Sequence, residues 1–212
     1  MASYLRKIIS CACCGNEYET RMLIGFTIRR EDVDLDTNPH NPALFDKIII
    51  CPHCGYVTSE PNGRIDDLIC SVVYSPNYQK LRSDSTLDLT AKKLLLAGLL
   101  YSSVDKIKEA AYSYLYAYWY QKEHNHADAV STCEKAINSF EKYLSDNENH
   151  EMAMILVDLL RQMSLFDEAL ETLGSLDFYT VNEPNYKAIS TFEKRLIIDK
   201  DCIAHRLSEV TI

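Results

Sequence analysis

The N-terminal part of the fold is decided by two short stretches, Cys11-Ala12-Cys13-Cys14-Gly15 and Cys51-Pro52-His53-Cys54-Gly55. Both read C-x-x-C-G. At this spacing two thiolates can reach one ion at about 2.3 Å, and the glycine that follows can take the positive φ that closes the turn beneath the sulfur. Two such turns supply four sulfur ligands. The sequence therefore predicts one closed, structural Zn²⁺ site on Cys11, Cys14, Cys51 and Cys54.

The pattern leaves some details of this site open. Cys13 lies inside the first turn and could replace Cys11 or Cys14, although only the latter two have the matching spacing and the following glycine. His53 is expected to face solvent rather than the ion. Iron has the same preference for four sulfurs, so the ligand set alone does not exclude it. Two separate redox pairs would call for a βαβ context that this region lacks.

Composition narrows the class of protein. The chain has 212 residues, a formal net charge of −9 and eight cysteines, and 47% of its residues are apolar. This acidity disfavours binding to nucleic acid, whose phosphates it would repel. We find neither a bilayer-length apolar run nor, in residues 1–10, a signal peptide. We therefore expect a cytoplasmic protein without membrane contact, whose clustered thiols bind metal and do not form disulfides. Cys70, Cys133 and Cys202 stand alone and are expected to be small buried hydrophobes.

The first 60 residues are predicted to form a small β module resembling a zinc ribbon. Strand-forming residues occupy 17–24 and 26–30, with Gly25 between them, and short apolar runs enter and leave the second cysteine pair at 47–50 and 56–58. Residues 31–42 are rich in Asp, Asn and Pro and are expected to form a solvated acidic loop. The calcium-loop interpretation fails because the required Gly and Glu are missing.

Residues 61–212 are predicted to be helical, so the fold class is mainly α, α+β overall. Apolar residues recur with the period of a helix, and Ser75-Pro76 reads as an N-cap followed by Pro at the first helical position. The alternating tyrosines from Tyr112 to Tyr120 resemble a strand, but they lie in a long stretch without Gly or Pro and are assigned to a central helix. Helices are predicted at 65–73, 86–101, 104–124, 127–144, 150–163, 166–173 and 186–207.

A weak repeat runs through these helices. Asp128-Ala129-Val130 and Asp167-Glu168-Ala169-Leu170 each follow the end of a predicted helix. A small residue at a helix crossing lets two antiparallel helices approach closely, as in tetratricopeptide (TPR) repeats. We therefore predict two or three stacked helix pairs in a TPR-like array, with a plain helical bundle as the alternative.

A resemblance supports this layout. The order of the first C-x-x-C-G, then Asn41-Pro42 and Phe45, then an apolar strand into the second C-x-x-C-G and Tyr56, resembles an uncharacterised bacterial family with a four-cysteine module and TPR-like helices behind it. Tyr118-Trp119-Tyr120 is similar to the aromatic tract of that family. The resemblance implies Zn²⁺ on the four cysteines and brings no activity or substrate. Ala12-Cys13 departs from the family pattern, which again leaves the choice of ligand in the first turn open.

Together these features favour a non-enzymatic, zinc-stabilised module whose helices present a surface to a protein or peptide. An acidic groove would suit a basic or amphipathic partner. The alternatives are a zinc-ribbon nucleic-acid-binding protein and an enzyme with a site in the helical domain. Against the enzyme, the sequence lacks a Gly-rich phosphate loop, H-E-x-x-H and G-x-S-x-G. His124 and His126 at a helix end are two positions apart and do not share a helical face.

Overall fold

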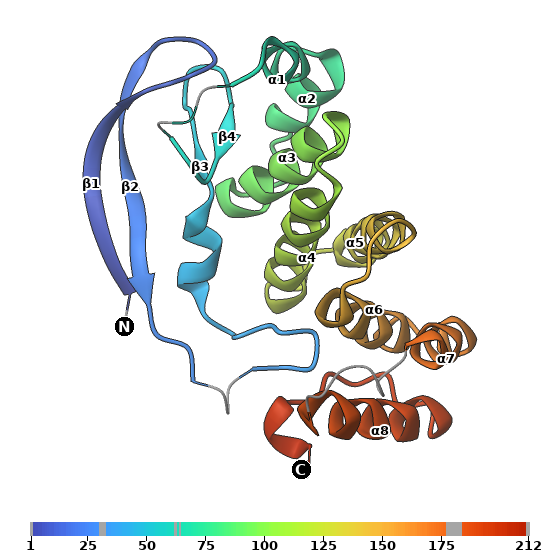
Figure 1. Ribbon diagram of the computed structural model, residues 1–212. Coiled ribbons are helices and arrows are strands. Elements are labelled where there is room, and N and C mark those ends of the chain that lie inside the picture. The colour runs from blue at the N-terminus through green and yellow to red at the C-terminus, as the bar shows by residue number, and fades with distance from the viewer. Residues whose placement is uncertain (1, 30–32, 62, 64, 177–183, 211–212) are drawn as a thin grey trace. The chain divides into compact units, whose positions relative to one another are not determined.

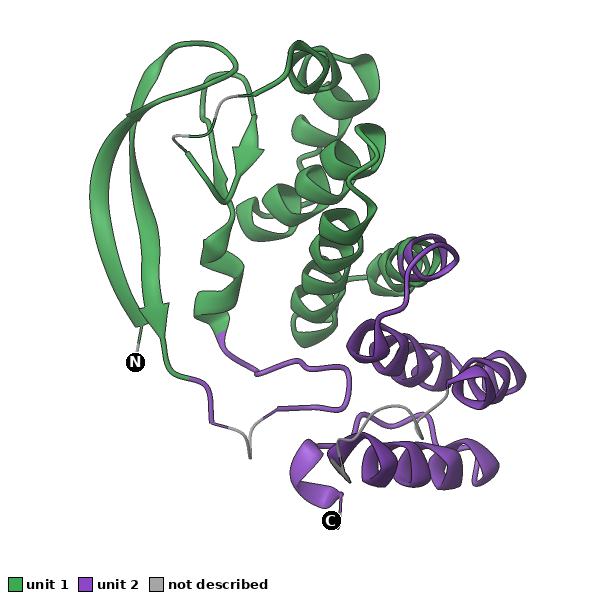
Figure 2. Ribbon diagram, viewed as in Figure 1, with its two compact units in different colours: residues 1–27, 42–139 green, residues 28–41, 140–212 purple. Residues whose placement is uncertain are grey.

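The structure is a computed structural model that describes residues 2–29, 33–61, 63, 65–176 and 184–210. It is 55% helical with a small β part near the N-terminus, which confirms the predicted fold class (Figure 1). The chain divides into two compact units, residues 1–27 with 42–139 and residues 28–41 with 140–212 (Figure 2). The predicted domain boundary at residue 60 and the TPR-like repeat stay predictions.

The first unit begins with a hairpin of two long antiparallel strands, β1 (Ala2–Ser10) and β2 (Glu17–Phe26). The two strand-forming runs predicted on either side of Gly25 are one strand up to Phe26, because β2 runs through Gly25 and pairs it with Ser3 beside a β-bulge. Strand β1 was not predicted. Only Ile9 on β1 is buried. A strand with so little buried surface does not need alternating apolar residues, and the sequence of β1 lacks the alternation that marks a half-buried strand.

A second, shorter hairpin carries the second cysteine pair. Strands β3 (Ile49–Ile50) and β4 (Val57–Thr58) pair antiparallel at the two places predicted. The 3₁₀ helix η2 (Pro42–Lys47) precedes β3 and buries Leu44 and Phe45. Both hairpins thus place a C-x-x-C-G turn between their strands.

Two short helices follow, α1 (Asp67–Val73) and α2 (Pro76–Arg82). The predicted cap at Ser75 is confirmed, since its hydroxyl accepts a hydrogen bond from the backbone of Tyr78 and Pro76 occupies the first helical position. Tyr78 is completely buried. This side chain therefore orients α2 toward the interior of the unit.

The core of the first unit lies between α3 (Leu89–Ser103) and α4 (Ile107–Glu123). The tyrosine-rich segment is helical, as predicted. Gly98 on α3 faces the ring of Tyr114 on α4 so closely that a β-carbon there would overlap the ring. This glycine lets the two helices approach, a role that the sequence had suggested for Ala129 and Ala169.

Helix α5 (Ala129–Leu144) contributes residues to both units. It packs through a narrow apolar stripe in which Cys133, Ala136 and Phe140 have no exposed surface. Cys133 is therefore a small buried hydrophobe, as predicted, whereas Ala129 is only half-buried.

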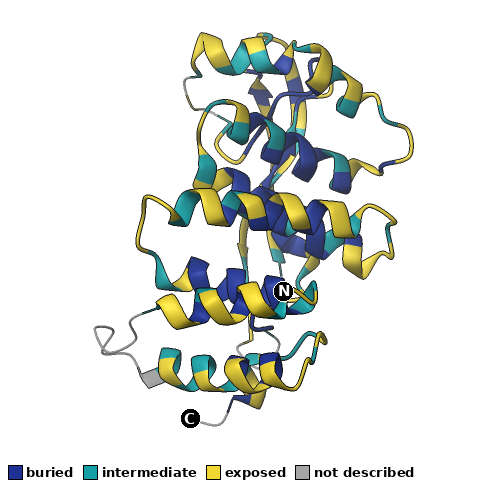
Figure 3. Cartoon of the chain, turned by 90° about the vertical axis from the view of Figure 1, so that its right-hand side faces the viewer, coloured by how far each residue is buried: buried dark blue, intermediate teal, exposed yellow. Residues whose placement is uncertain are grey.

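The second unit contains α6 (His150–Gln162), α7 (Phe166–Ser175), α8 (Pro184–Ile198) and the 3₁₀ helix η3 (Leu207–Glu209). Helix α6 is buried from Met152 to Arg161, and Ala169 on α7 is fully buried. Outer helical faces are exposed and inner faces buried, as Figure 3 shows. Among the described residues, every helix is too short or too polar to cross a bilayer.

Helix α8 ends nine residues before the predicted end at residue 207, because a side chain from α6 forms hydrogen bonds with the backbone carbonyls that follow it. Arg161 on α6 donates through Nη1 to the carbonyl oxygens of Asp201 and Ile203, at 2.7 and 2.8 Å. Those carbonyls follow Lys200, whose φ of 53° already departs from the helix. The C-terminal segment is thus attached to α6.

The predicted solvated loop at 31–42 is wrong where the structure describes it. Asp34, Asp36 and Asn38 are 5%, 2% and 5% exposed. Backbone groups of this loop pair with the C-terminal segment: the Leu35 amide donates to the His205 carbonyl at 2.9 Å. Leu35 also joins Leu196 and Val210 in an apolar cluster. These long-range contacts bury a loop whose composition indicates solvent exposure, and residues 31–32 lie outside the description.

Candidate metal centre

The two C-x-x-C-G turns have the same backbone hydrogen bonds. In the first, the Gly15 amide donates to the Cys11 carbonyl at 2.8 Å, and in the second the Gly55 amide donates to the Cys51 carbonyl at 2.9 Å. Each opening cysteine also donates its amide across the turn, to Asn16 and to Tyr56. Gly15 and Gly55 have φ of 74° and 85°, the left-handed conformation that the spacing required.

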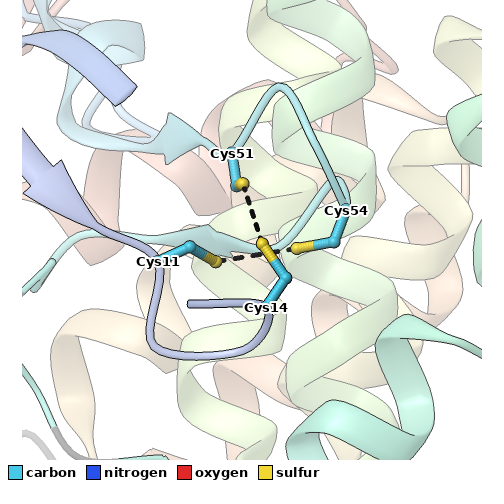
Figure 4. A group of neighbouring side chains, drawn as sticks. All are labelled: Cys11, Cys14, Cys51 and Cys54. Atoms are coloured by element: carbon cyan, nitrogen blue, oxygen red, sulfur yellow. Dashed lines mark hydrogen bonds between the residues drawn. The ribbon is translucent and has the colours of Figure 1, made fainter. Parts of the chain in front are cut away.

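These turns bring the four predicted cysteines to one point. Their Sγ atoms all lie within 4.8 Å of one another, and the side chains converge from the two hairpins (Figure 4). The Sγ atoms of Cys11 and Cys54 are 3.6 Å apart, and those of Cys14 and Cys51 are 3.8 Å apart. Each close contact therefore joins one turn to the other.

The sulfur separations fit a tetrahedral metal ion. Four sulfurs at about 2.3 Å from a central ion would lie about 3.8 Å from each other, close to the two separations observed. A disulfide would need about 2.05 Å, and none of the eight cysteines, all of which the structure describes, forms one. The arrangement is therefore compatible with one ion held by four sulfurs.

The other thiols and His53 are not part of this cluster. Cys13 is outside the four-sulfur group, and its carbonyl lies 3.9 Å from the Sγ of Cys70 on α1. The side chain of His53 is exposed. Cys70 is half-buried and Cys202 is exposed, so the prediction that both are buried hydrophobes is wrong. Cys202 lies in the segment that follows the end of α8.

Side chains of helix α2 donate hydrogen bonds to the backbone of the second C-x-x-C-G turn. Tyr78 donates its hydroxyl to the Gly55 carbonyl at 2.8 Å, and Gln79 donates to the Cys54 carbonyl at 3.2 Å. Arg82 donates to the carbonyls of Pro52 and His53 at 3.2 and 2.8 Å. Outer contacts of this kind orient metal ligands. These hydrogen bonds were not predicted from the sequence, because the residue pattern of α2 does not show that its polar side chains contact the backbone of another segment.

Thiols of this cluster differ in their electrostatic environment, even within one turn. Burial raises the pKa of Cys54 and of Cys11. At Cys14 burial also acts to raise the pKa, but hydrogen bonds from the Asn16 backbone and the neighbouring thiols outweigh it, and the pKa falls to about 7. Nitrogen donors also reach two sulfurs: Asn16 Nδ2 lies 3.5 Å from Cys14 Sγ, and the Tyr56 amide 3.4 Å from Cys54 Sγ.

Comparison with known proteins finds one family. A family model described as "Uncharacterized protein conserved in bacteria (DUF2225)" matches residues 4–194, which include both cysteine pairs and most of the helices. No curated protein and no solved structure matches the chain.

Proposed function

Because the chain belongs to DUF2225, a family of uncharacterized proteins conserved in bacteria, we propose its function from its own geometry: a non-enzymatic module, stabilised by Zn²⁺, that binds a protein or peptide partner through its helices. The observation that carries the metal assignment is the set of sulfur separations of 3.6 and 3.8 Å between the two turns. Four sulfurs complete the preferred coordination of Zn²⁺ and leave no position for substrate, so the ion is structural.

The proposed ion would join the two hairpins. Cys11 and Cys14 belong to the β1–β2 hairpin, and Cys51 and Cys54 to the β3–β4 hairpin. Since α2 binds the carbonyls of the second turn, an ion on all four sulfurs would tie the first hairpin to the helices. This role accounts for the position of the cysteines without any chemistry at the metal.

The interaction role is supported by the form of the helical part. Its helices are joined mainly by short turns, and their cores are apolar, which makes stable outer faces available for binding. The acidity of the chain, with a net charge of −9, favours a basic partner. We place the protein in the reducing cytoplasm, where free cysteines persist as thiols.

Metal analysis of the purified chain tests the first part of this proposal. We expect one Zn²⁺ per chain, released by a strong chelator with loss of protease resistance in residues 2–29, while far-ultraviolet circular dichroism retains most of the helical signal. Cys51→Ser should lose the ion, whereas Cys133→Ser, which alters a thiol outside the cluster, should keep it. A stoichiometry near zero in freshly reduced protein, or iron in place of zinc, contradicts the Zn²⁺ assignment.

The interaction role is tested by crosslinking in bacterial cells that express the wild-type chain or Cys51→Ser, with partners identified by mass. We expect specific partners that remain attached through the helical part when the cysteine site is altered. Turnover of a small molecule by the purified chain would contradict the non-enzymatic assignment.

A further inference from the structure

A pocket of about 740 Å³ opens in the second unit, between the end of α5, the start of α6 and the second half of α7. Its apolar lining consists of Leu144, Ala153, Leu156 and Leu176. Ala153 and Leu156 are buried on α6, so they form a rigid floor. The volume is in the range of ligand-binding pockets in proteins, roughly 300–1,000 Å³.

The charged lining of this pocket has one sign. Glu141, Glu148 and Glu171 all contribute to it, and the lining includes neither lysine nor arginine, with His150 as its one imidazole. The three glutamates come from α5, from the loop before α6 and from α7, and all are exposed at the rim. Their negative potential therefore surrounds an apolar floor from three sides.

The loop that carries Glu148 is fixed in place. Asn147 donates its side-chain amide to the Tyr143 carbonyl at 2.8 Å, and Asn149 caps α6 by accepting from the Met152 amide at 3.0 Å. Glu148 lies between these two anchors. The rim is thus organised before any ligand arrives, which reduces the entropy lost on binding.

We propose that this pocket binds a lysine or arginine side chain of a basic peptide segment. Such a side chain has an apolar stem that would lie on Leu144 and Leu156, and a cationic head that would remain at the rim among the carboxylates. A purely apolar residue would leave the carboxylates without a counter-charge, and an acidic residue would be repelled. This inference rests on the proposed interaction role and names the partner chemistry for one site.

The test uses the full, zinc-loaded chain and a fluorescent peptide that alternates lysine with alanine, with anisotropy as the readout at low salt. Peptides with glutamate or norleucine in place of lysine probe charge and stem separately. We expect saturable binding of the lysine peptide alone. The double variant Glu148→Gln/Glu171→Gln should weaken it about fivefold, since each partly exposed ion pair contributes modestly.

An acidic chain can attract any cationic peptide, so the control must match net charge. Glu151→Gln/Glu168→Gln removes two exposed carboxylates from α6 and α7 that do not line the pocket, and it should leave the affinity unchanged. Equal weakening by both double variants would overturn the site, as would full binding by a Leu156→Ala variant that remains folded. If the wild-type chain binds none of the peptides yet retains crosslinked partners in cells, the pocket assignment is wrong and the broader interaction role stands.

Discussion

Arg161 on α6 donates through Nε to a carboxyl oxygen of Glu193 on α8 at 2.9 Å, and both side chains are completely shielded from solvent. The same guanidinium forms an ion pair with Asp158. One cation and two carboxyl groups therefore share a buried site. Burial and the charge of Asp158 raise the pKa of Glu193 well above its ordinary value, although Arg161 opposes them. A raised pKa favours the neutral form of Glu193, which reduces the number of charges held in the buried cluster.

Removing the cation from this cluster should be costly. Arg161→Met leaves Asp158 buried without its counter-charge and frees the carbonyls of Asp201 and Ile203, so we expect the unfolding free energy to fall by about 3–5 kcal/mol. Lys194→Met on the exposed face of α8 is the matched control and should change it by less than about 0.5 kcal/mol. Urea denaturation of both variants, followed by circular dichroism, measures the difference. Equal stability of the two variants would refute this account of the cluster.

The raised pKa of Glu193 predicts a specific pH dependence of stability. Folding takes up a proton at this residue when the pH lies between its ordinary pKa of 4.5 and its raised pKa, so its contribution to stability declines as pH rises through this interval. Glu193→Gln carries no titrating group and should remove this decline, which reaches at most about 1.4 kcal/mol for each pH unit. Urea midpoints for wild type and variant, measured from about pH 5 to pH 8, give the difference.

The slope of the unfolding free energy against pH must be compared between wild type and Glu193→Gln, because the titration of His205 changes stability in the same direction. Burial lowers the pKa of His205, but its hydrogen bonds to the carboxylates of Glu209 and Asp201 outweigh that effect and leave the pKa raised. Its contribution also weakens as pH rises through that value. A variant slope identical to the wild-type slope would mean that Glu193 is ionised in the fold.

Contacts between residues close in sequence could be predicted, whereas the main contact between distant residues that could be predicted was the convergence of the four cysteines. The C-x-x-C-G turns close through hydrogen bonds spanning four or five positions, so spacing and a glycine were sufficient to predict them. The cap of α2 at Ser75 is equally local. By contrast, Asp158 and Arg161 read as ordinary polar helix positions, and only the approach of α8 turns them into a buried cluster.

The same distinction explains the errors at the chain ends. Strand β1 exists because β2 provides a partner for its backbone, not because its own residues alternate. Helix α8 ends before the predicted residue because Arg161 donates hydrogen bonds to the backbone carbonyls that follow the helix. Within the candidate metal centre, the convergence of the four cysteines was predicted, but the support of the second turn by α2 depends on side chains some thirty residues away.

The contact between Gly98 and Tyr114 predicts a strong effect of a single methyl group. Gly98→Ala should separate α3 from α4 and lower the unfolding free energy by about 1–3 kcal/mol, even though alanine is the better helix former. Gly174→Ala on α7 is the control, since a β-carbon there meets nothing within 4 Å and should be neutral or stabilising. Thermal unfolding of both variants tests the pair. A Gly98→Ala protein as stable as wild type would show that the helices can adjust without cost.

The two glycines of the metal centre should respond differently to the same substitution. Both have positive φ, so alanine at either position carries a backbone cost of about 1 kcal/mol. At Gly15 a β-carbon meets nothing within 4 Å, whereas at Gly55 it would lie 2.5 Å from Cδ of Arg82. Arg82 is not free to move without losing its hydrogen bonds to the carbonyls of Pro52 and His53.

We therefore expect Gly55→Ala to weaken Zn²⁺ binding more than Gly15→Ala, by roughly a further tenfold, because it disturbs the outer contacts that orient the second turn. Competition with a chromophoric chelator measures both affinities. Adding Arg82→Ala to each variant separates the steric conflict from the backbone cost. In the Gly55→Ala background Arg82→Ala removes that conflict, so the further loss of Zn²⁺ affinity that it causes should be much smaller there than in the Gly15→Ala background. Equal penalties in the two backgrounds would mean that Arg82 does not constrain the turn through Gly55.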